Sequence, residues 1–512
     1  MQRIAIIDVG SNSARLVITH IYKSGAYNMV YNQKEPLRLS QKIDKNEALT
    51  PEAFVDTIET LKSFAFMCKL YKADVTIAVA TAAIRNATNG NELTNMVEKA
   101  TGITLHIISG NTEAYISYLG VINTLPYKNG IIFDLGGGST ELIFFQERKI
   151  VESVSLPFGA VNTTAMFNTR NTMSNNVYSD LSFFLSSRLA QHPWLKHPGL
   201  PLIGVGGTVR TLGKIHQRSV KYPTSKIHNY KFSAQNMRTI FNKLRDTTIE
   251  QRRKVSGLSS ERADIILAGA GIVNCLLDVT GSKQIIVSGC GLREGLFFDY
   301  YSKEQNLPLI AADILERSTE NILKLYSPDT THSNHITKLA LSLFDAWKPL
   351  HGLNKTYRRL LKTAALLHDI GITVNFYSHA RHSAYMIQNA QLFGLTHHEQ
   401  IFVSAIAGWH NGVSKNYFRD RVYKEMLTSS QWEAVNKLAL LLAIAENLDY
   451  SQNSHITSVQ ATTEKKKATL LLHTSMGIPS LEIHQLRQQM PWFSKTFGIE
   501  LSIDFIGEPA NP

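Results

Sequence analysis

The stretch "IIFDLGGGSTELIFF", residues 131–145, places three consecutive glycines between two strongly apolar runs. Asp134 lies near the end of the first run, and Glu141 lies at the start of the second. Apolar runs of this length are typical of buried strands, and a short connection of glycine and serine is typical of a hairpin turn. The stretch therefore predicts a β-hairpin whose turn exposes its main chain between two carboxylates.

A second stretch, "IIDVGSNSARLVI" at residues 6–18, has the same pattern. Asp8 and Ser13 occupy the positions of Asp134 and Ser139, and the turn is again made of small residues. The copies lie too far apart for the period of a solenoid repeat. The sequence therefore predicts two duplicated domains, each built around one such hairpin.

Glycine-rich turns of this kind can bind phosphate, because glycine lets successive main-chain N–H groups point at one anion. The carboxylates of Asp134 and Glu141 would by themselves repel a phosphate. A magnesium ion between them removes this conflict, since magnesium binds carboxylate oxygens and bridges to phosphate oxygens. For a single hairpin a tight surface turn is the simpler interpretation. Two matching copies favour a phosphate site with a bound cation.

The order of predicted elements divides the chain. Strands and helices alternate up to about residue 305, which predicts an α/β fold with helices packed on sheets. Nine of the 18 histidines lie between His332 and His410, within a region of successive helical patterns, and the last segment is typical of strand, helix, strand. We predict four domains: two duplicated α/β domains at residues 1–124 and 125–305, an all-α domain at 306–455 and a small α+β domain at 456–512.

The composition limits the class of protein. Hydrophobic residues make up 44% of the chain and charged residues 18%, which is typical of a globular protein. Three cysteines, Cys68, Cys275 and Cys290, are too few and too scattered for a disulfide framework or a zinc site, so we expect a cytoplasmic location. We see no signal peptide and no apolar run of about 18 residues, so we expect no integral membrane contact.

The net charge of +12 is concentrated in one segment, residues 210–254, which we call the basic belt. It contains 12 lysines and arginines against Asp246 and Glu250. Such a segment can attract a polyanion, although a solvated helical surface remains an alternative.

The paired hairpins resemble the phosphate-binding hairpins of the sugar-kinase, heat-shock-chaperone and actin superfamily, which implies ribonuclease-H-like, actin-type α/β domains. Within it, the chain closely resembles the exopolyphosphatase and guanosine-pentaphosphate phosphohydrolase family. The matching segments fall between residues 4 and 297 and include "IDVGSNSARLVI", "ATAAIRNATNG", "ISGNTEAYISYLGV", "FDLGGGSTEL", "LPFGAVNTT", "GVGGTVRTL", "SSERADIILAGAGIV" and "SGCGLREGL".

The resemblance implies a role for individual residues. Glu113, which follows "SGN", matches the glutamate that activates a water as general base, and a carboxylate is suited to that task. It implies a magnesium site, with a monovalent cation such as potassium as a second candidate cofactor. The implied metal ligands are Asp134, Glu141 and Asp8. The implied phosphate-binding residues are Gly10, Ser11, Asn12, Ser13, Arg15, Arg85, Gly136, Gly137, Gly138, Ser139, Gly207 and Thr208.

The helical region after about residue 310 resembles the histidine/aspartate phosphohydrolase-like domain of long family members. One departure is visible, because the usual Ala-Asp pair is Ala445-Glu446 here, which leaves Glu446 or Asp449 as the last ligand. Glutamate is longer by one methylene, so we expect a mainly structural or polymer-guiding domain, and a second metal site is the alternative. The other ligand candidates are His335, His368, Asp369, His382 and His410.

The resemblance implies a magnesium-dependent enzyme that releases terminal phosphate processively from inorganic polyphosphate. Hydrolysis of guanosine pentaphosphate is the alternative substrate, alone or in addition. An ATP-driven kinase or chaperone and a non-catalytic polyphosphate-binding regulator are less consistent with the sequence. We expect a homodimer that binds no specific nucleic acid.

Overall fold

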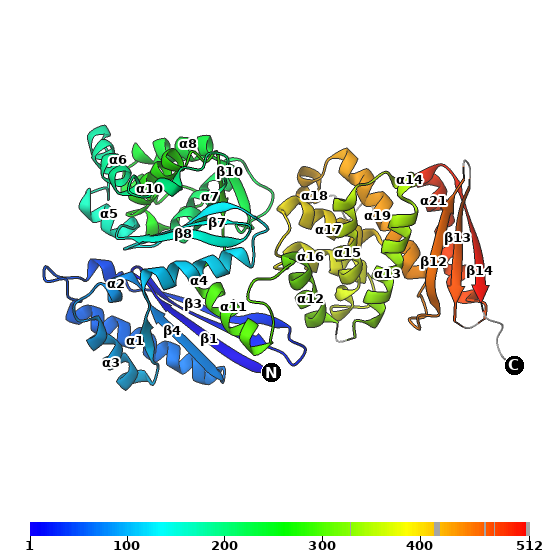
Figure 1. The fold of residues 1–512 in the computed structure, drawn as a ribbon, viewed down its shortest axis with the longest axis horizontal. Helices are drawn as coiled ribbons and strands as arrows, with labels where there is room; N and C mark the ends of the chain where they lie inside the picture. The colour runs from blue at the N-terminus through cyan, green and yellow to red at the C-terminus, as the bar shows by residue number, and fades with distance from the viewer. Residues whose placement is uncertain (328, 414–419, 465–466, 476, 508–512) are drawn as a thin grey trace. The chain divides into compact units, whose positions relative to one another are not determined.

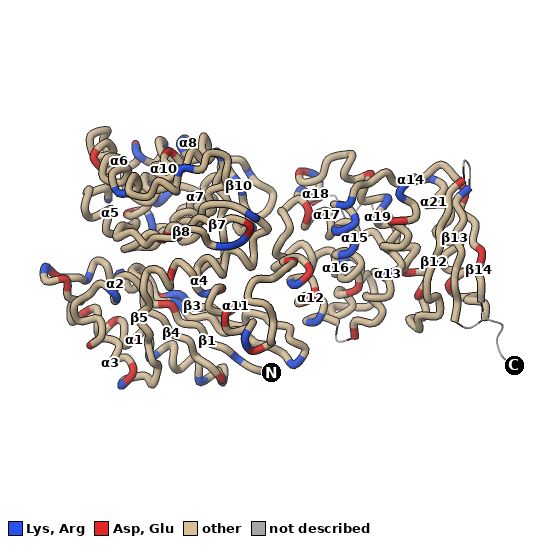
Figure 2. The backbone as a smooth tube through the Cα atoms, viewed as in Figure 1, with Lys and Arg blue, Asp and Glu red and all other residues tan. Residues whose placement is uncertain are grey.

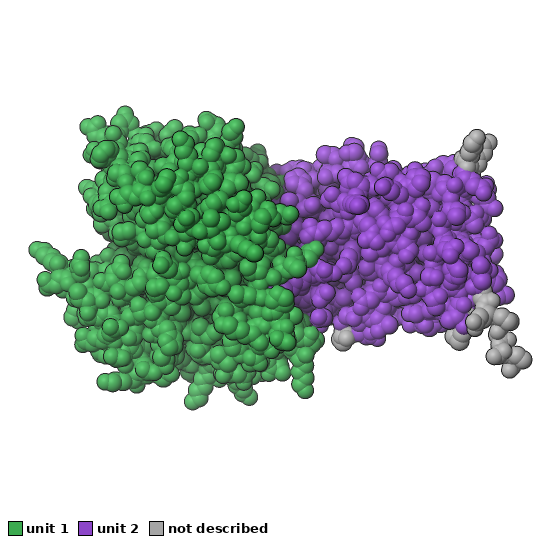
Figure 3. Space-filling view, in the orientation of Figure 1, with its two compact units in different colours: residues 1–314 green, residues 315–512 purple. Residues whose placement is uncertain are grey.

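The computed structural model describes residues 1–327, 329–413, 420–464, 467–475 and 477–507. The chain forms two compact units, Met1–Ile314 and Leu315–Pro512, which Figure 3 distinguishes by colour. Each unit is described separately below. The boundaries of the four predicted domains stay predictions.

Unit 1 begins with a mixed five-stranded sheet (Figure 1). The strand order is β3-β2-β1-β4-β5. Strand β1 is antiparallel to β2 and parallel to β4. The strands are β1 (Gln2–Val9), β2 (Ser13–Ile21), β3 (Tyr27–Pro36), β4 (Val75–Ala80) and β5 (Leu105–Ile107).

The second sheet of unit 1 repeats this topology. Its order is β10-β11-β9-β6-β7-β8, so β8-β7-β6-β9-β11 corresponds to β3-β2-β1-β4-β5 and β10 is an addition. The register also repeats, because Asp8 lies opposite Arg15 and Asp134 lies opposite Glu141. The predicted duplication is therefore confirmed. The strands are β6 (Gly130–Leu135), β7 (Thr140–Gln146), β8 (Lys149–Leu156), β9 (Leu202–Val205), β10 (Tyr230–Ser233) and β11 (Gln284–Val287).

Helices cover both sheets. The first of them, α1 (Pro51–Leu70), begins where the Thr50 side chain accepts a bond from the Ala53 N–H and proline occupies the first turn. The others in unit 1 are α2 (Ala82–Arg85), α3 (Gly90–Thr101), α4 (Gly110–Ile122), α5 (Ala160–Met166), α6 (Asn175–Leu189), α7 (Gly207–Ser219), α8 (Ala234–Arg245), α9 (Ile249–Arg252), α10 (Ile266–Thr280) and α11 (Leu292–Glu304).

The strands β6, β7 and β9 of the second sheet are buried on both faces, which explains their continuous apolar sequences. Ile131 and Phe133 point into the core formed with α6, α8 and α10, whereas Ile132 points into a separate core formed with α4. Side chains alternate along a strand, so Asp134 shares the face of Ile132 and points toward α4. The strand pattern thus places a carboxylate between the sheet and α4.

Helices α4 and α11 occupy equivalent positions in the two copies and pack closely against each other. Glycine makes this approach possible. A Cβ at Gly120 would lie 2.1 Å from the Gly291 carbonyl oxygen, and a Cβ at Gly295 would lie 1.9 Å from the Ile116 carbonyl oxygen. Backbone therefore packs directly on backbone where the two copies meet.

Unit 2 is mainly helical and ends in a three-stranded sheet, β12-β13-β14. None of the helices that the structure describes is both long and apolar enough to cross a membrane. The main helices are α12 (Ile314–Tyr326), α13 (Thr331–Ala346), α14 (Lys348–His351), α15 (Lys355–Leu367), α16 (His379–Asn389), α17 (His397–Trp409), α18 (Arg421–Met426) and α19 (Ser429–Asn447).

The end of the chain differs from the predicted strand, helix, strand. Two strands, β12 (Ile456–Thr463) and β13 (Lys467–Thr474), precede the helical part. That part consists of two helices, α20 (Ser480–Arg487) and α21 (Met490–Phe497), and β14 (Glu500–Gly507) follows. The predicted single helix is divided into α20 and α21 for a local reason. A proline, which has no N–H to donate, occupies the first turn of α21.

We predict that Gly295→Ala destabilises unit 1. Helix propensity alone would make the alanine variant more stable than the wild-type protein by about 1 kcal/mol. The Cβ would instead meet the main chain of α4, and such overpacking costs about 1–3 kcal/mol. Urea unfolding measures the difference, with Lys303→Ala on the exposed face of α11 as the control. A stabilised Gly295→Ala variant would show that the helices do not approach as closely as described.

Candidate active site

The two hairpin turns have the same main-chain geometry. The Gly10 N–H donates to the Ser13 carbonyl at 3.1 Å, and the Gly136 N–H donates to the Ser139 carbonyl at 3.1 Å. Each turn leaves its remaining N–H groups near the end of a strand that carries an aspartate. The predicted phosphate-binding turns are therefore alike in structure as well as in sequence.

The two turns touch each other. A Cβ at Gly137 would lie 3.0 Å from the Ser11 Cβ, and a Cβ at Gly138 would lie 3.1 Å from the Ser11 Oγ. Larger residues at these positions would push the turns apart. Glycine thus brings two turns that are distant in sequence onto one site.

A cavity of about 140 Å³ lies where the turns meet. Acidic side chains and arginines both line it. Its walls include Asp8, Gly10, Ser11, Asn12, Ser13, Arg15, Glu113, Asp134, Gly136, Gly137, Ser139, Gly207, Arg210 and Arg262. Most of the predicted site residues therefore line a single cavity.

The predicted metal ligands Asp8 and Asp134 line this cavity and are partly buried. Burial raises the pKa of both carboxyls, and that of Asp134 reaches about 6. The Ser117 Oγ of α4 donates to Asp134 at 2.6 Å and partly opposes the increase. Arg15, opposite Asp8 in the hairpin, lowers the pKa of Asp8.

Glu113 lies in the first turn of α4 and is 9% exposed. Burial raises its pKa to about 7, against the opposing effect of Arg85. The Arg85 guanidinium donates to the Glu113 carboxylate at 2.8 Å and to the Ile108 carbonyl at 3.0 Å. A carboxylate with a pKa near neutrality is suited to general-base catalysis.

Arg85 and Glu141, which the sequence analysis assigned to phosphate and metal binding, are not among the described residues that line the cavity. Arg85 pairs with Glu113, and it is not among the described residues that line the cavity. Glu141 is 1% exposed, accepts a bond from the Ser155 Oγ at 2.8 Å and also stands outside the cavity wall. Burial and the charges of Glu113 and Asp134 raise the pKa of Glu141. Their predicted roles in phosphate and metal binding stay predictions.

The donor set is compatible with magnesium at Asp8 and Asp134. Magnesium is commonly bound by one or two carboxylates together with water and phosphate oxygens. Both carboxylates line the cavity, and the charge of Asp8 contributes to raising the pKa of Asp134, so a cation would relieve their repulsion. Glu141 fits this role less well because its carboxylate is bonded to Ser155.

Arg210 and Arg262 line the cavity, but the sequence analysis did not assign them to the site. Burial lowers the pKa of Arg262 to about 10 and lowers that of Arg210 as well. Arg262 lies directly against Gly207, where a Cβ would be 1.8 Å from its Nη2. Both arginines occur within or beside motifs that carried the family resemblance, "GVGGTVRTL" and "SSERADIILAGAGIV", which is the signal that could have identified them.

Other predicted residues are close to the cavity without lining it. Thr208 is 1% exposed at the start of α7 and lies near Gly269, where a Cβ would be 2.6 Å from its Cγ2. Gly138 contacts the opposite turn. Both residues pack against the site, and their predicted role in phosphate binding stays a prediction.

The basic belt is not one continuous surface. Figure 2 shows lysines and arginines spread over many elements of unit 1. Arg252 is fully buried and donates to the carbonyls of Ala263 at 2.7 Å, Arg170 at 2.6 Å and Asn171. It therefore stabilises loops and cannot face a polymer, whereas Arg253 and Lys254 beside it are exposed.

Unit 2 contains a cluster of histidines and acids that differs in part from the predicted ligand set. His368, Asp369, His410 and Glu446 belong to it, as expected. His332 and His379 take part instead of His335 and His382. Each replacement is one helical turn from the predicted residue, and the His335 Nε2 lies 2.9 Å from the Ile456 carbonyl.

Comparison with known proteins identifies the class. The model of the Ppx/GppA phosphatase family matches residues 17–304, and the model of Ppx/GppA phosphatase domain III matches residues 314–489. The chain therefore belongs to the Ppx/GppA phosphatase family.

Solved structures agree with this assignment. The Ppx/GppA family member of Aquifex aeolicus is 31% identical over 59% of this chain and 98% of its own length, with a TM-score of 0.53. A structure of an exopolyphosphatase from Cytophaga hutchinsonii ATCC 33406 is 24% identical over 60% of this chain and all of its own, with a TM-score of 0.55. At that identity the second similarity shows the fold alone.

We predict that activity falls at acidic pH because Glu113 becomes protonated. A general base must be deprotonated, so kcat/KM should fall as the pH drops below about 7. Arg85→Ala removes the charge that lowers the pKa of Glu113, so the fall in kcat/KM should begin at a higher pH. Initial rates of phosphate release across pH measure the shift, and Arg188→Ala on α6 is the control. An unchanged pH profile in Arg85→Ala would contradict the assignment of Glu113 as the general base.

Proposed function

We propose that this Ppx/GppA phosphatase removes terminal orthophosphate from inorganic polyphosphate. The observation that carries the proposal is the convergence of the two predicted phosphate-binding turns on one cavity that carboxylates and arginines both line. A phosphoanhydride end is small, strongly anionic and rich in acceptor oxygens. Main-chain N–H groups and arginines suit that ligand.

Glu113 is the proposed general base. Its carboxylate is buried at the cavity wall with a pKa of about 7, so near neutral pH it can accept a proton from a water. The Arg85 guanidinium holds one of its oxygens in place. The water then attacks the terminal phosphorus in line with the leaving phosphate oxygen.

Arginines and main chain would bind the transferred phosphate. Arg15, Arg210 and Arg262 would neutralise the charge that the phosphate oxygens carry through the reaction. Asp8 and Asp134 would hold magnesium, which supplies additional charge neutralisation when bound. A monovalent cation and homodimer formation remain further proposals.

One face of α7 favours a polymeric substrate. Arg210, Lys214 and Arg218 recur every four residues, so they lie on the same helix face and extend about 12 Å from the cavity. Lys214 and Arg218 also line a second cavity of about 710 Å³ with Tyr222 and Gly257. This α7 basic face could hold the rest of the chain while its end reacts.

Guanosine pentaphosphate is the alternative substrate. Its terminal phosphate has the same anhydride chemistry and could enter the same cavity. Guanosine pentaphosphate does not need an extended basic surface, so the α7 basic face favours polyphosphate as the substrate.

We expect the wild-type protein to release phosphate from long polyphosphate faster than from guanosine pentaphosphate or ATP. Glu113→Gln should lower kcat by about 10²–10⁴-fold, because it removes the proton acceptor while keeping the shape. Glu92→Gln, in the first turn of α3, is the matched control. Orthophosphate release measures all three substrates. Undiminished activity of Glu113→Gln would reject the mechanism, whereas preference for guanosine pentaphosphate would assign the alternative substrate.

We further expect the double variant Lys214→Glu, Arg218→Glu to lose processivity. Gel analysis of products from long polyphosphate should show intermediate lengths accumulating, and the salt dependence of KM should weaken. Hydrolysis of a very short chain should change little. Lys243→Glu, on the exposed surface of α8, is the control. Equal processivity in the double variant and wild type would reject the α7 basic face as the binding surface.

A further inference from the structure

The segment that follows β3, residues 37–41, is fixed to the first hairpin turn by main-chain hydrogen bonds. The Arg38 N–H donates to the Asn12 carbonyl at 3.0 Å, and the Ser40 N–H donates to the Ser11 carbonyl at 3.1 Å. Ser11 and Asn12 both line the cavity of unit 1. The segment therefore borders the candidate active site from the first of the two duplicated halves.

Two basic side chains connect this region to the second half of unit 1. The Arg38 Nη1 lies 3.4 Å from the Asp264 Oδ2, and the Arg38 Nη2 lies 3.4 Å from the main-chain oxygen of Glu261. The ammonium group of Lys34, near the end of β3, bonds to the Glu261 carboxylate. Residues 261–264, which precede α10, are thus fastened to the first half through both of their acids.

Arg262 lies between these two acids in the sequence and lines the cavity. Burial and the charge of Arg210 lower its pKa, to about 10, whereas the charges of Glu261 and Asp264 raise it. Both acids are therefore within electrostatic reach of Arg262. Among the described residues, however, none accepts a hydrogen bond from the Arg262 guanidinium. Its donors consequently stay available to an anion in the cavity.

Asp264 is the acid most able to compete for Arg262. It is 9% exposed, and its Oδ1 is buried without a hydrogen-bond partner among the described residues. A buried carboxylate with an unpartnered oxygen is costly, so it would pair with any guanidinium within reach. The nearby Arg252 is already engaged by three main-chain carbonyls. Arg38 is thus the cation that occupies Asp264.

The main chain of Arg38 has a conformation that favours glycine. Its φ of 53° and ψ of 39° lie in the left-handed region. A side chain costs about 1–2 kcal/mol in that region. Such strain persists where the surrounding structure requires a particular residue. The contacts of the Arg38 guanidinium with the second half supply that requirement.

We propose that Arg38, together with Lys34, is a positioning residue that keeps Arg262 available to the phosphate of the substrate. Arg38 and Lys34 occupy Asp264 and Glu261, which would otherwise pair with Arg262 and draw it away from the cavity. This inference rests on the proposed function, because it requires Arg262 to bind phosphate. It adds a means by which the first half of unit 1 controls a cation that the second half supplies.

Direct binding of phosphate by Arg38 is the competing explanation. The Arg38 side chain is 38% exposed and therefore accessible to an anion. It is not among the described residues that line the cavity, and its guanidinium contacts Asp264 and a main-chain oxygen. The two explanations make opposite predictions for a second substitution at Asp264.

The test measures the affinity of the full chain for inorganic phosphate by isothermal titration calorimetry, at a fixed concentration of Mg²⁺. Arg38→Ala should weaken binding about 10-fold, which corresponds to the loss of one charge-assisted hydrogen bond. Asp264→Asn in the Arg38→Ala protein removes the competing charge. The double variant should therefore recover the wild-type affinity to within about 2-fold.

Arg262→Ala provides a second measurement. It should weaken phosphate binding at least as much as Arg38→Ala, and adding Arg38→Ala to it should have no further effect, because the positioned group is absent. Arg238→Ala is the matched control, since it breaks an exposed ion pair with Asp278 at 2.6 Å. Arg38→Gly relieves the left-handed strain and should bind phosphate as weakly as Arg38→Ala, and the Tm of every variant checks its fold.

The outcomes separate the explanations. If the variant with both Arg38→Ala and Asp264→Asn binds phosphate as weakly as Arg38→Ala alone, then Arg38 contacts the phosphate itself and the positioning role is wrong. Unchanged affinity in Arg38→Ala or in Arg262→Ala would also overturn the proposal. The proposed function fails separately, if the wild-type protein binds phosphate but releases none from polyphosphate. Absence of phosphate binding by the wild-type protein would overturn both.

Discussion

The contact between the two hairpin turns is the constraint on which unit 1 depends. Gly137 and Gly138 lie against Ser11 at distances that leave little room for a Cβ. The crossing of α4 and α11 follows the same rule, since Gly120 and Gly295 let main chain approach main chain. Glycine thus lets the two duplicated halves approach closely at both contacts. Their strand ends, each carrying an aspartate, consequently open onto one cavity.

Burial then determines the electrostatics of this cavity. Because α4 covers one face of the second sheet, the carboxylate of Asp134 is partly shielded from solvent. Its charged form is disfavoured, so the pKa values of Asp134 and Glu113 rise. Burial has the opposite effect on the nearby guanidinium groups of Arg210 and Arg262, whose pKa values fall. Such a concentration of perturbed groups is typical of a functional site.

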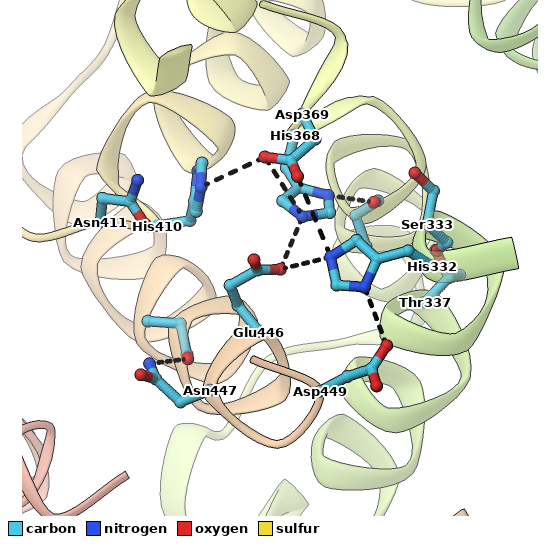
Figure 4. A network of polar contacts seen from close by, with 12 residues as sticks. His332, Ser333, Thr337, His368, Asp369, His410, Asn411, Glu446, Asn447 and Asp449 are labelled. Carbon is cyan, nitrogen blue, oxygen red and sulfur yellow. Dashed lines mark hydrogen bonds and ion pairs between the residues drawn. The ribbon is translucent and has the colours of Figure 1, made fainter. Parts of the chain in front are cut away.

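Unit 2 shows a related principle with different chemistry. Burial again leaves polar atoms in need of a partner, because the His332 Nε2 and the Asp369 Oδ1 have no hydrogen-bond partner among the described residues. The His368 Nε2, by contrast, lies 2.7 Å from the Glu446 carboxylate (Figure 4).

The sequence by itself determined the duplication, the two turns and the α/β order, because strand periodicity and glycine placement are local properties. It also named Asp8, Asp134 and Glu113, which line the cavity and whose roles stay predictions. Only the tertiary structure decided which basic residues face that cavity: Arg210 does, whereas Arg252 is buried among loop carbonyls. It likewise selected one histidine from each pair separated by a single helical turn. Periodicity shows which residues share one face of a helix. The position along each helix at which neighbouring helices meet depends on packing between residues far apart in the chain.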